Sequence, residues 1–228
     1  MLIDTFAACV IEVGPETPTS RATRLLLHFD DLTDSSKTGK AIINNGVTIV
    51  EKSGAFGGKC AYFNGSSRLT LPDYADLHFG SGDWTIDWRE YKTLAKGSVF
   101  NLNSTSGGLG VLAEHMDGTQ LYISSGSAWE LVSAAPAFPL ALNQWVHRAL
   151  VRNGSRLVSY QNGTKVWESM ISGDPVSSNL VGSFIGSHGD PGNPDYFTGY
   201  LDEFRVSIGA ARWTAGFVPP TGPYPVND

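Results

Sequence analysis

The carboxylates are the first candidates for chemistry, because a glycoside hydrolase needs two of them on one face. Retaining enzymes place the two carboxyl groups about 5 Å apart, and inverting enzymes about 6.5–9.5 Å apart. Asp87 and Glu90 lie three residues apart in the β-prone stretch 83–91, so in a strand they point to opposite faces, with Asp87 expected on a solvated outer face. Asp202 and Glu203 are adjacent and are also expected to face opposite ways. The sequence therefore predicts no acid/base pair.

Other catalytic patterns are also missing from the sequence. The five histidines share no HxH or HxxxH spacing, and no Gly-x-Ser-x-Gly elbow precedes a helical segment. The two cysteines, Cys9 and Cys60, lack the Cys-x-x-Cys or Cys/His spacing of a zinc site and do not make a disulfide scaffold. Cys60 stands in an apolar stretch, where it is expected to be a buried small hydrophobe. We expect a protein that is not an enzyme.

Two loops carry side chains suited to binding a sugar, which needs an aromatic platform and a few planar amides or carboxylates. Loop 126–129 presents Trp129 as a stacking ring, and loop 186–196 concentrates polar and aromatic groups. The candidate ligand-binding residues are His188, Asp190, Asn193, Asp195, Tyr196 and Trp129. The alternatives are that the longer loop is a plain Gly/Pro turn and that Trp129 belongs to the core.

Composition indicates the kind of domain that must position these loops. The chain has 228 residues, of which 17% are charged, 26 are glycine and 12 are proline, and aromatic residues make up 11%. Few charges with many turn-formers and aromatics favour an all-β domain over a helical or disordered chain. The net charge of −6 and the lack of Lys/Arg clusters argue against nucleic acid or an anionic membrane surface as partner.

The pattern of elements divides the chain at residue 23. Residues 1–23 end in a Pro/Thr/Ser-rich stretch and are expected to be an N-terminal arm or linker, and residues 24–228 a single domain. About a dozen short strands are expected at 25–30, 60–63, 68–71, 83–91, 98–102, 109–114, 120–124, 144–151, 155–160, 165–169, 180–185 and 199–207. Tight turns at 64–67, 152–154 and 161–163 predict hairpins. Single helical turns are expected at 72–77 and 209–213.

No export signal or membrane span is evident. The first nine residues carry an acid where a signal peptide needs cations, and the longest uncharged stretch, 131–147, is broken by two prolines. We expect a location in a virion or on an extracellular surface, reached without a signal peptide.

An ordered set of motifs carries a family resemblance. The segments are LHFD at 27–30, FGGKCAYFNG at 56–65, LTLP at 69–72, FGSGDWTIDW at 79–88, NQWVH at 143–147, YQNG at 160–163 and GYLDEFRVS at 199–207. Together they resemble a laminin-G-like (LamG) jelly roll of the concanavalin A-like lectin/glucanase superfamily. The tail, ARW at 211–213 and FVPP at 217–220, is similar to a form common in bacteriophage and bacterial surface proteins. The resemblance implies an all-β, two-sheet antiparallel β-sandwich.

The resemblance also bears on catalysis and metal binding. Glucanases of the superfamily carry a Glu-x-Asp-x-x-Glu strand, and Thr85 stands where the nucleophilic Glu is required. Members often bind calcium through Asp and Asn oxygens, which implies a site made by Asp30, Asp34 and Asp202. The alternative is that Asp30 and Asp202 are buried acids satisfied by backbone N–H groups or by Arg205.

These observations lead to one functional interpretation and two alternatives. We expect a non-enzymatic, lectin-like carbohydrate-binding module for a cell-surface glycan, carried as a bacteriophage virion component such as a fibre, decoration or tail-tip structural protein. The arm would attach it to other virion proteins, in a homo-oligomer or multicopy assembly. The first alternative is a structural or protein-interaction domain without a sugar site, and a glycoside hydrolase is the second.

Overall fold

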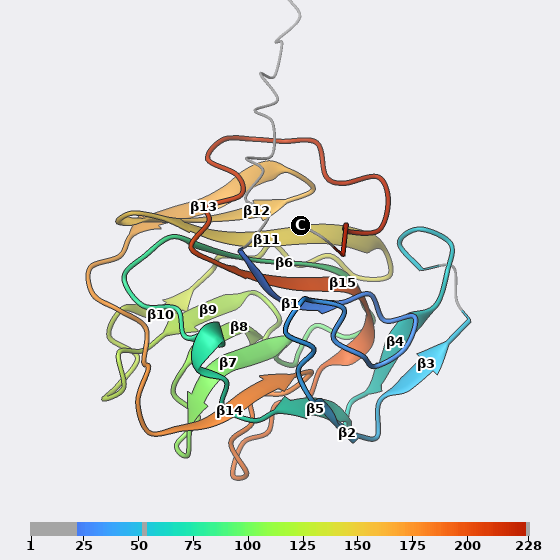
Figure 1. Ribbon diagram of the computed structural model, residues 1–228, viewed down its shortest axis with the longest axis horizontal. Coiled ribbons are helices and arrows are strands. Elements are labelled where there is room, and N and C mark those ends of the chain that lie inside the picture. The colour runs from blue at the N-terminus through green and yellow to red at the C-terminus, as the bar shows by residue number, and fades with distance from the viewer. Residues whose placement is uncertain (1–21, 52–53, 227–228) are drawn as a thin grey trace, which may run out of the picture.

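The strands are arranged in two antiparallel sheets that pack face to face (Figure 1). The computed structural model describes residues 22–51 and 54–226. Sheet A has the order β13-β12-β11-β6-β15-β4-β3, and β1 also pairs with β15. Its strands are β1 (Thr23–Leu27), β3 (Thr48–Val50), β4 (Cys60–Asn64), β6 (Trp84–Lys92), β11 (Trp145–Asn153), β12 (Arg156–Gln161), β13 (Thr164–Met170) and β15 (Thr198–Ile208).

Sheet B lies beneath sheet A in Figure 1 and has the order β10-β9-β8-β7-β14-β5-β2. Its strands are β2 (Ile43–Asn45), β5 (Arg68–Leu71), β7 (Phe100–Thr105), β8 (Val111–His115), β9 (Gln120–Ile123), β10 (Val132–Ala135) and β14 (Leu180–Ile185). The expected all-β sandwich is confirmed, and the expected strands all form. The expectation missed only the short β2, β3 and β10.

Alternation along the strands builds the core. Trp84, Ile86 and Trp88 of β6 all point between the sheets and are fully buried, as a period of two requires. The Trp88 ring meets Phe100 of sheet B edge to face, with ring centroids 5.1 Å apart. Cys60 is fully buried, as expected. These aromatic contacts between the sheets fix the frame on which the loops stand.

The tight turns have two different outcomes. The turns at 152–154 and 161–163 join paired strands, and in the second Asn162 and Gly163 both have positive φ, +50° and +76°. A Cβ on Gly163 would lie 1.7 Å from the Phe217 carbonyl oxygen, so only glycine fits there. The hairpin expected at 64–67 is wrong, because its turn leads from β4 in sheet A to β5 in sheet B.

The sequence predicted two single helical turns and no membrane span. One 3₁₀ turn, Ala75–Leu77, forms within the expected segment 72–77. The helical turn expected at 209–213 does not form. Among the described residues, no helix has the length and apolarity that crossing a bilayer requires.

The outer face of sheet A is covered by the C-terminal segment 209–226, the red loop above β11 and β12 in Figure 1. Trp213 and Phe217 stack with their centroids 4.0 Å apart and pack on side chains of β11 and β12. Asp87 lies under this cover at 0% exposure and forms an ion pair with Arg205, 3.0 Å from Oδ1 to Nε. The expectation of a solvated Asp87 is therefore wrong, because a segment far away in the sequence closes that face.

Ala22 and Thr23, the last two residues of the expected arm, have defined places in the structure. Residues 1–21 lie outside the described residues. Ala22 is buried and accepts a hydrogen bond from the Ile208 amide, and Thr23 begins β1 opposite Ser207. The last two residues of the expected arm therefore pack with the sandwich.

Candidate functional site

A change of partner along β15 creates a gap in sheet A. One edge of β15 pairs with β6, while the other pairs with β4 through residues 198–201 and with β1 through residues 204–207. Asp202 and Glu203 fall between these two partners, where the register with β6 also shifts. Glu203 has φ of +50°, a conformation that side chains other than Gly, Asn or Asp rarely adopt. The strand therefore bulges at these two residues.

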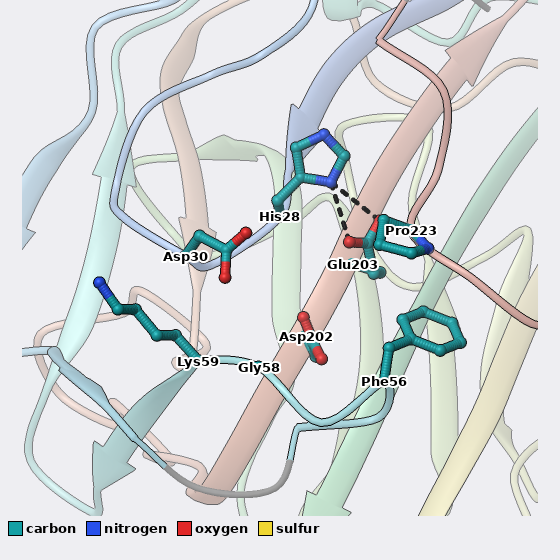
Figure 2. A pocket seen from close by; sticks show the side chains of 8 residues that line it. All are labelled: His28, Asp30, Phe56, Gly58, Lys59, Asp202, Glu203 and Pro223. Carbon is teal, nitrogen blue, oxygen red and sulfur yellow. Dashed lines mark hydrogen bonds and ion pairs between the residues drawn. The ribbon is translucent and has the colours of Figure 1, made fainter.

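The gap holds a small pocket, which we call the strand-switch pocket (Figure 2). It has a volume of about 100 Å³ and lies where β1 ends, the loop into β4 begins and β15 bulges. Its lining residues are His28, Asp30, Phe56, Gly58, Lys59, Asp202, Glu203 and Pro223. Asp202 and Glu203 thus line one cavity, and the expectation that they face opposite ways is wrong. The bulge breaks the period of two on which that expectation depended.

Glu203 has partners within the pocket wall. The His28 Nδ1 lies 2.9 and 3.0 Å from its two carboxylate oxygens, and the Tyr224 amide donates to Oε2 at 2.8 Å. The hydrogen bond to Glu203 raises the pKa of His28 above its ordinary value, against the opposing effect of burial. Glu203 and His28 therefore form a local ion pair whenever the imidazole is protonated.

Asp202 is less well compensated than Glu203. Its residue is 5% exposed, and its Oδ2 accepts a hydrogen bond from the Ala55 amide at 2.9 Å. Burial, reinforced by the nearby carboxylates of Glu203 and Asp30, raises the pKa of Asp202 to about 7. No cationic side chain among the described residues pairs with it. Near neutral pH this carboxyl group can both donate and accept a hydrogen bond.

The expected calcium ligands do not form one set. Asp34 binds elsewhere, accepting hydrogen bonds from the amides of Leu26, Ser36 and Lys40 at 3.0, 2.9 and 2.8 Å. Only Asp30 and Asp202 share a pocket. Within residues 22–51 and 54–226 no group of three or more His, Cys, Asp or Glu side chains is placed to hold a metal ion. The grouping of Asp30, Asp34 and Asp202 is therefore wrong, and the donor set does not fit calcium, which needs six to eight oxygens.

The alternative interpretation of Asp202 is supported in part. Its carboxylate does accept a backbone N–H bond, from Ala55, as that alternative required. Arg205, the other suggested partner, pairs with Asp87 instead. The side chain therefore lies in the pocket wall without a cation at ion-pair distance, and His28 is the nearby group whose pKa it helps to raise.

The two loops that the sequence suggested for sugar binding meet on the outer face of sheet B. Leu121 and Ile123 point into the core, so Tyr122 between them points outward. Its ring lies 5.4 Å from that of Trp129, which in turn lies 6.2 Å from the His188 ring. The His115 ring completes the group, 4.9 Å from His188 and 5.5 Å from Tyr122. We call these four residues the aromatic cluster.

Hydrogen bonds hold loop 186–196 against the sheet. The Asn101 amide of β7 donates to the carbonyls of Gly108 and His188 at 2.6 and 2.8 Å. The Asp195 carboxylate accepts from Ser98 Oγ at 2.8 Å and from the Met116 amide at 2.9 Å, and it also lies 2.7 Å from His115 Nδ1. Asp195 is therefore an anchor of the loop rather than a free acceptor for a ligand.

The remaining candidates differ in what they can offer a ligand. His188 is buried, and that burial lowers its pKa, so the imidazole stays neutral at neutral pH. Asp190 accepts from the Gly192 amide at 2.8 Å, while Asn193 is exposed. Tyr196 and Trp129 are half-buried, and neither belongs to the core clusters. Trp129, Asp190, Asn193 and Tyr196 are thus the side chains with surface available to a ligand.

Sequence reasoning missed two members of the aromatic cluster. Tyr122 could have been found from alternation in 120–124, because its apolar neighbours on both sides face the core. His115 follows a bulge between β8 and β9, which the sequence does not reveal. The pocket residues His28, Phe56 and Lys59 were also missed, because no local pattern shows where β15 changes partners.

A separate group of four charged residues lies inside the sandwich. We call Glu90, Lys92, Glu114 and Arg148 the buried charge cluster, and each is 0% exposed. Arg148 approaches Glu90 at 3.0 Å and Glu114 at 3.2 Å, and Lys92 Nζ lies 2.5 Å from Glu114. Burial and the Glu90 carboxylate raise the pKa of Glu114 to about 7. Because a substrate cannot reach these residues, the cluster is structural.

Comparison with known families now identifies the domain. Residues 63–213 match the family model Laminin_G_3, described as the concanavalin A-like lectin/glucanases superfamily. The chain belongs to this superfamily. The match covers more than half of the sequence and confirms the resemblance seen in its motifs. The domain is thus of the concanavalin A-like, carbohydrate-binding type, and its fold is that of a lectin-like binding module.

Solved structures of similar fold include a domain of an extracellular arabinanase and chains of a botulinum neurotoxin and a mosquitocidal protein. Domain 4 of AbnA, an extracellular arabinanase of Geobacillus stearothermophilus solved with arabinotriose, has a TM-score of 0.61 and 21% identity over 83% of this chain and 94% of that domain. Botulinum neurotoxin type C, which depends on two ganglioside molecules to enter cells, gives 0.60 and 11%, over 83% of this chain and 48% of that one.

The binding domain of Paraclostridial Mosquitocidal Protein 1 gives a TM-score of 0.57 and 16% identity, over 84% of this chain and 50% of that domain. The chain therefore spans nearly all of the arabinanase domain but about half of the toxin chains. At these identities the likeness concerns the fold. No curated protein matches the sequence.

Proposed function

We propose that this domain is a non-enzymatic glycan-binding module, with its sugar site at the aromatic cluster. The observation that carries the proposal is the meeting of Trp129 with loop 186–196. Two loops almost sixty residues apart bring a half-buried indole beside Tyr122, with Asp190 and Asn193 on the same loop as His188. A ring for stacking with nearby amide and carboxylate groups is what a sugar site needs. The superfamily and the sugar-binding neighbours support this choice.

A site of this kind binds weakly. Each hydrogen bond to a sugar hydroxyl replaces one to water and contributes only about 0.5–1.5 kcal/mol net. A millimolar dissociation constant corresponds to about −4 kcal/mol, so useful adhesion requires several copies on one particle. We therefore propose that the domain acts in a multicopy assembly, as a bacteriophage fibre, decoration or tail-tip component that binds host-surface glycans.

The virion setting is supported by the sequence of the tail and by the predicted arm. Residues 211–213 and 217–220 have the form common in phage and bacterial surface proteins. Deletion of residues 1–20 should leave the melting temperature within a few degrees, because β1 begins at Thr23. The same deletion should abolish assembly onto the partner. Collapse of the fold on truncation would contradict the arm.

A glycan array displaying the domain in multivalent form tests the function. We expect binding by the wild type, loss in Trp129→Ala and strong weakening in the double variant Asp190→Ala/Asn193→Ala. The control Lys165→Ala removes an exposed charge from β13 in the opposite sheet and should bind like the wild type. Wild-type binding by the cluster variants would refute this site. No binding to any glycan would favour the structural or protein-interaction alternative.

The non-enzymatic part of the proposal has its own test. Asp87, the acid on the strand where glucanases of the superfamily keep their carboxylates, is sealed against Arg205, and Thr85 donates its hydroxyl proton to the Ala210 carbonyl at 2.9 Å. We expect no release of reducing ends from β-glucans. Turnover abolished by Asp202→Asn would instead establish a hydrolase in the strand-switch pocket.

A further inference from the structure

The cations around the strand-switch pocket are mostly committed to partners other than Asp202. His28 pairs with Glu203, and Lys59 Nζ lies 3.8 Å from the Glu51 carboxylate, pointing away from Asp202 in Figure 2. The Arg89 guanidinium lies over the Phe56 ring, 4.4 Å from its centroid, and donates to the Pro220 carbonyl. The pocket therefore has more negative groups than cations that compensate them.

Asp202 and Asp30 are the two carboxyl groups left over. Asp30 is exposed at the rim, whereas Asp202 is 95% buried and forms the wall of the cavity. Burying a carboxyl group without a cation at ion-pair distance is unfavourable, and the backbone hydrogen bonds from Ala55 and Glu203 offset only part of that cost, because the pKa of Asp202 is still raised. A cation entering the cavity would supply the missing charge.

We propose that the strand-switch pocket binds the protonated primary amine of an amino sugar. The cavity of about 100 Å³ is the space of roughly three water molecules, so it accepts an ammonium group with one or two carbons rather than a whole sugar ring. The ring of Phe56 and that of Pro223 offer apolar contact to those carbons. The pocket alone supports binding of an amine. That the amine belongs to a sugar rests on the proposed glycan-binding function.

An ammonium group fits these residues better than other cations do. A metal ion needs a group of ligands that the described residues do not form. A guanidinium presents a wide planar fork that suits two parallel acceptors in an open site, whereas an ammonium is a compact charge with three donors. Asp202 on the wall and Asp30 at the rim can accept two of those three hydrogens.

Isothermal titration calorimetry at neutral pH tests the pocket with defined probes. We expect ethylammonium and glucosamine to bind, and glucose, N-acetylglucosamine and calcium chloride to give no heat of binding. Asp202→Asn should weaken both amines at least tenfold. Asp30→Asn, at an exposed position, should weaken them severalfold. The control Asp73→Asn, an exposed carboxylate outside the pocket lining and outside the aromatic cluster, should bind both amines like the wild type.

The remaining outcomes separate the two proposals. Equal binding of glucose and glucosamine, calcium binding in place of amines, or wild-type affinity in both Asp202→Asn and Asp30→Asn would overturn the amine site. Binding of Nα-acetyl-lysine methylamide but not glucosamine would overturn the sugar as carrier and assign the amine to a protein. If Trp129→Ala lost binding on the glycan array but kept its calorimetric affinity for glucosamine, the aromatic cluster and the strand-switch pocket would be two separate sites.

Discussion

The buried charge cluster and the strand-switch pocket both contain buried carboxyl groups, but they differ in how closely cations approach those groups. In the cluster, Arg148 and Lys92 contact the carboxyl groups of Glu90 and Glu114, although burial and the Glu90 carboxylate still raise the pKa of Glu114 to about 7. In the pocket, His28 pairs with Glu203 and also attracts Asp202, but no described cation lies within ion-pair distance of Asp202. The cluster is closed between the sheets, whereas the pocket opens where β15 changes partners. In both places burial raises the pKa of one carboxyl group, Glu114 or Asp202, to about 7. Of these two groups, Asp202 is the one that lines a cavity into which a ligand could enter.

The largest loss of stability should come from removing Arg148 from the buried charge cluster. Arg148→Met removes the one side chain that contacts both glutamates and leaves Lys92 alone with two buried carboxyl groups. Breaking a buried pair from one side costs about 3–5 kcal/mol, because the remaining charge stays buried without compensation. Urea unfolding should show a loss of stability of that size.

Arg156→Met is the matched control for this experiment. Arg156 also pairs with a glutamate, Glu168, but its side chain is 48% exposed, and exposed pairs contribute little to stability. The control should unfold at the urea concentration of the wild type. If Arg148→Met did the same, the cluster would not be the compensated unit that the distances describe.

The parts of this comparison differ in how far the sequence could predict them. The strand at 83–91 and the hairpin turn at Asn162 could be predicted, because both depend on neighbours within a few residues. The burial of Asp87 depends on a segment about 125 residues away, which no local pattern encodes. The bulge depends on positive φ at Glu203, a residue type that does not signal such a conformation.

The candidate sugar site also has features that the local sequence predicts and features that depend on distant parts of the chain. The Gly/Pro-rich composition of 186–196 predicted an irregular loop. The structure places this loop beside Trp129. Its polar residues could not be sorted in advance into anchors and free groups. Asp195 is an anchor because Ser98 and the Met116 amide happen to lie beside it, and both come from other parts of the chain.

A second prediction tests the burial of Asp202 in the strand-switch pocket through the pH dependence of folding stability. Because the pKa of Asp202 is raised to about 7, the folded protein keeps this proton between about pH 4 and pH 7, whereas the unfolded chain has released it. Rising pH therefore favours unfolding across that window. Asp202→Asn lacks this term, so its stability relative to the wild type should increase from pH 4 to pH 8 by on the order of 3 kcal/mol.

Urea titrations at several pH values measure this difference, and Asp174→Asn, at an exposed position, should show no such trend. A flat difference between Asp202→Asn and the wild type would mean that Asp202 is already compensated in the folded protein. The comparison with the buried charge cluster would then fail at the pocket. Ethylammonium added at pH 7 should reduce the difference, because the bound cation stabilises the ionised carboxylate of the wild type.

The smallest expected effect concerns Asn193, which is exposed at the tip of its loop. Surface substitutions away from special contacts usually change stability by less than about 0.5 kcal/mol, so Asn193→Ala should unfold like the wild type. Asp195→Ala is the matched opposite on the same loop, since it removes the acceptor shared by Ser98 and the Met116 amide. Each lost bond to a charged acceptor contributes about 1.5–3 kcal/mol, so this variant should be clearly destabilised. Equal stability of the two variants would show that Asp195 does not anchor the loop, and the division between anchoring and ligand-facing residues in the aromatic site would have to be redrawn.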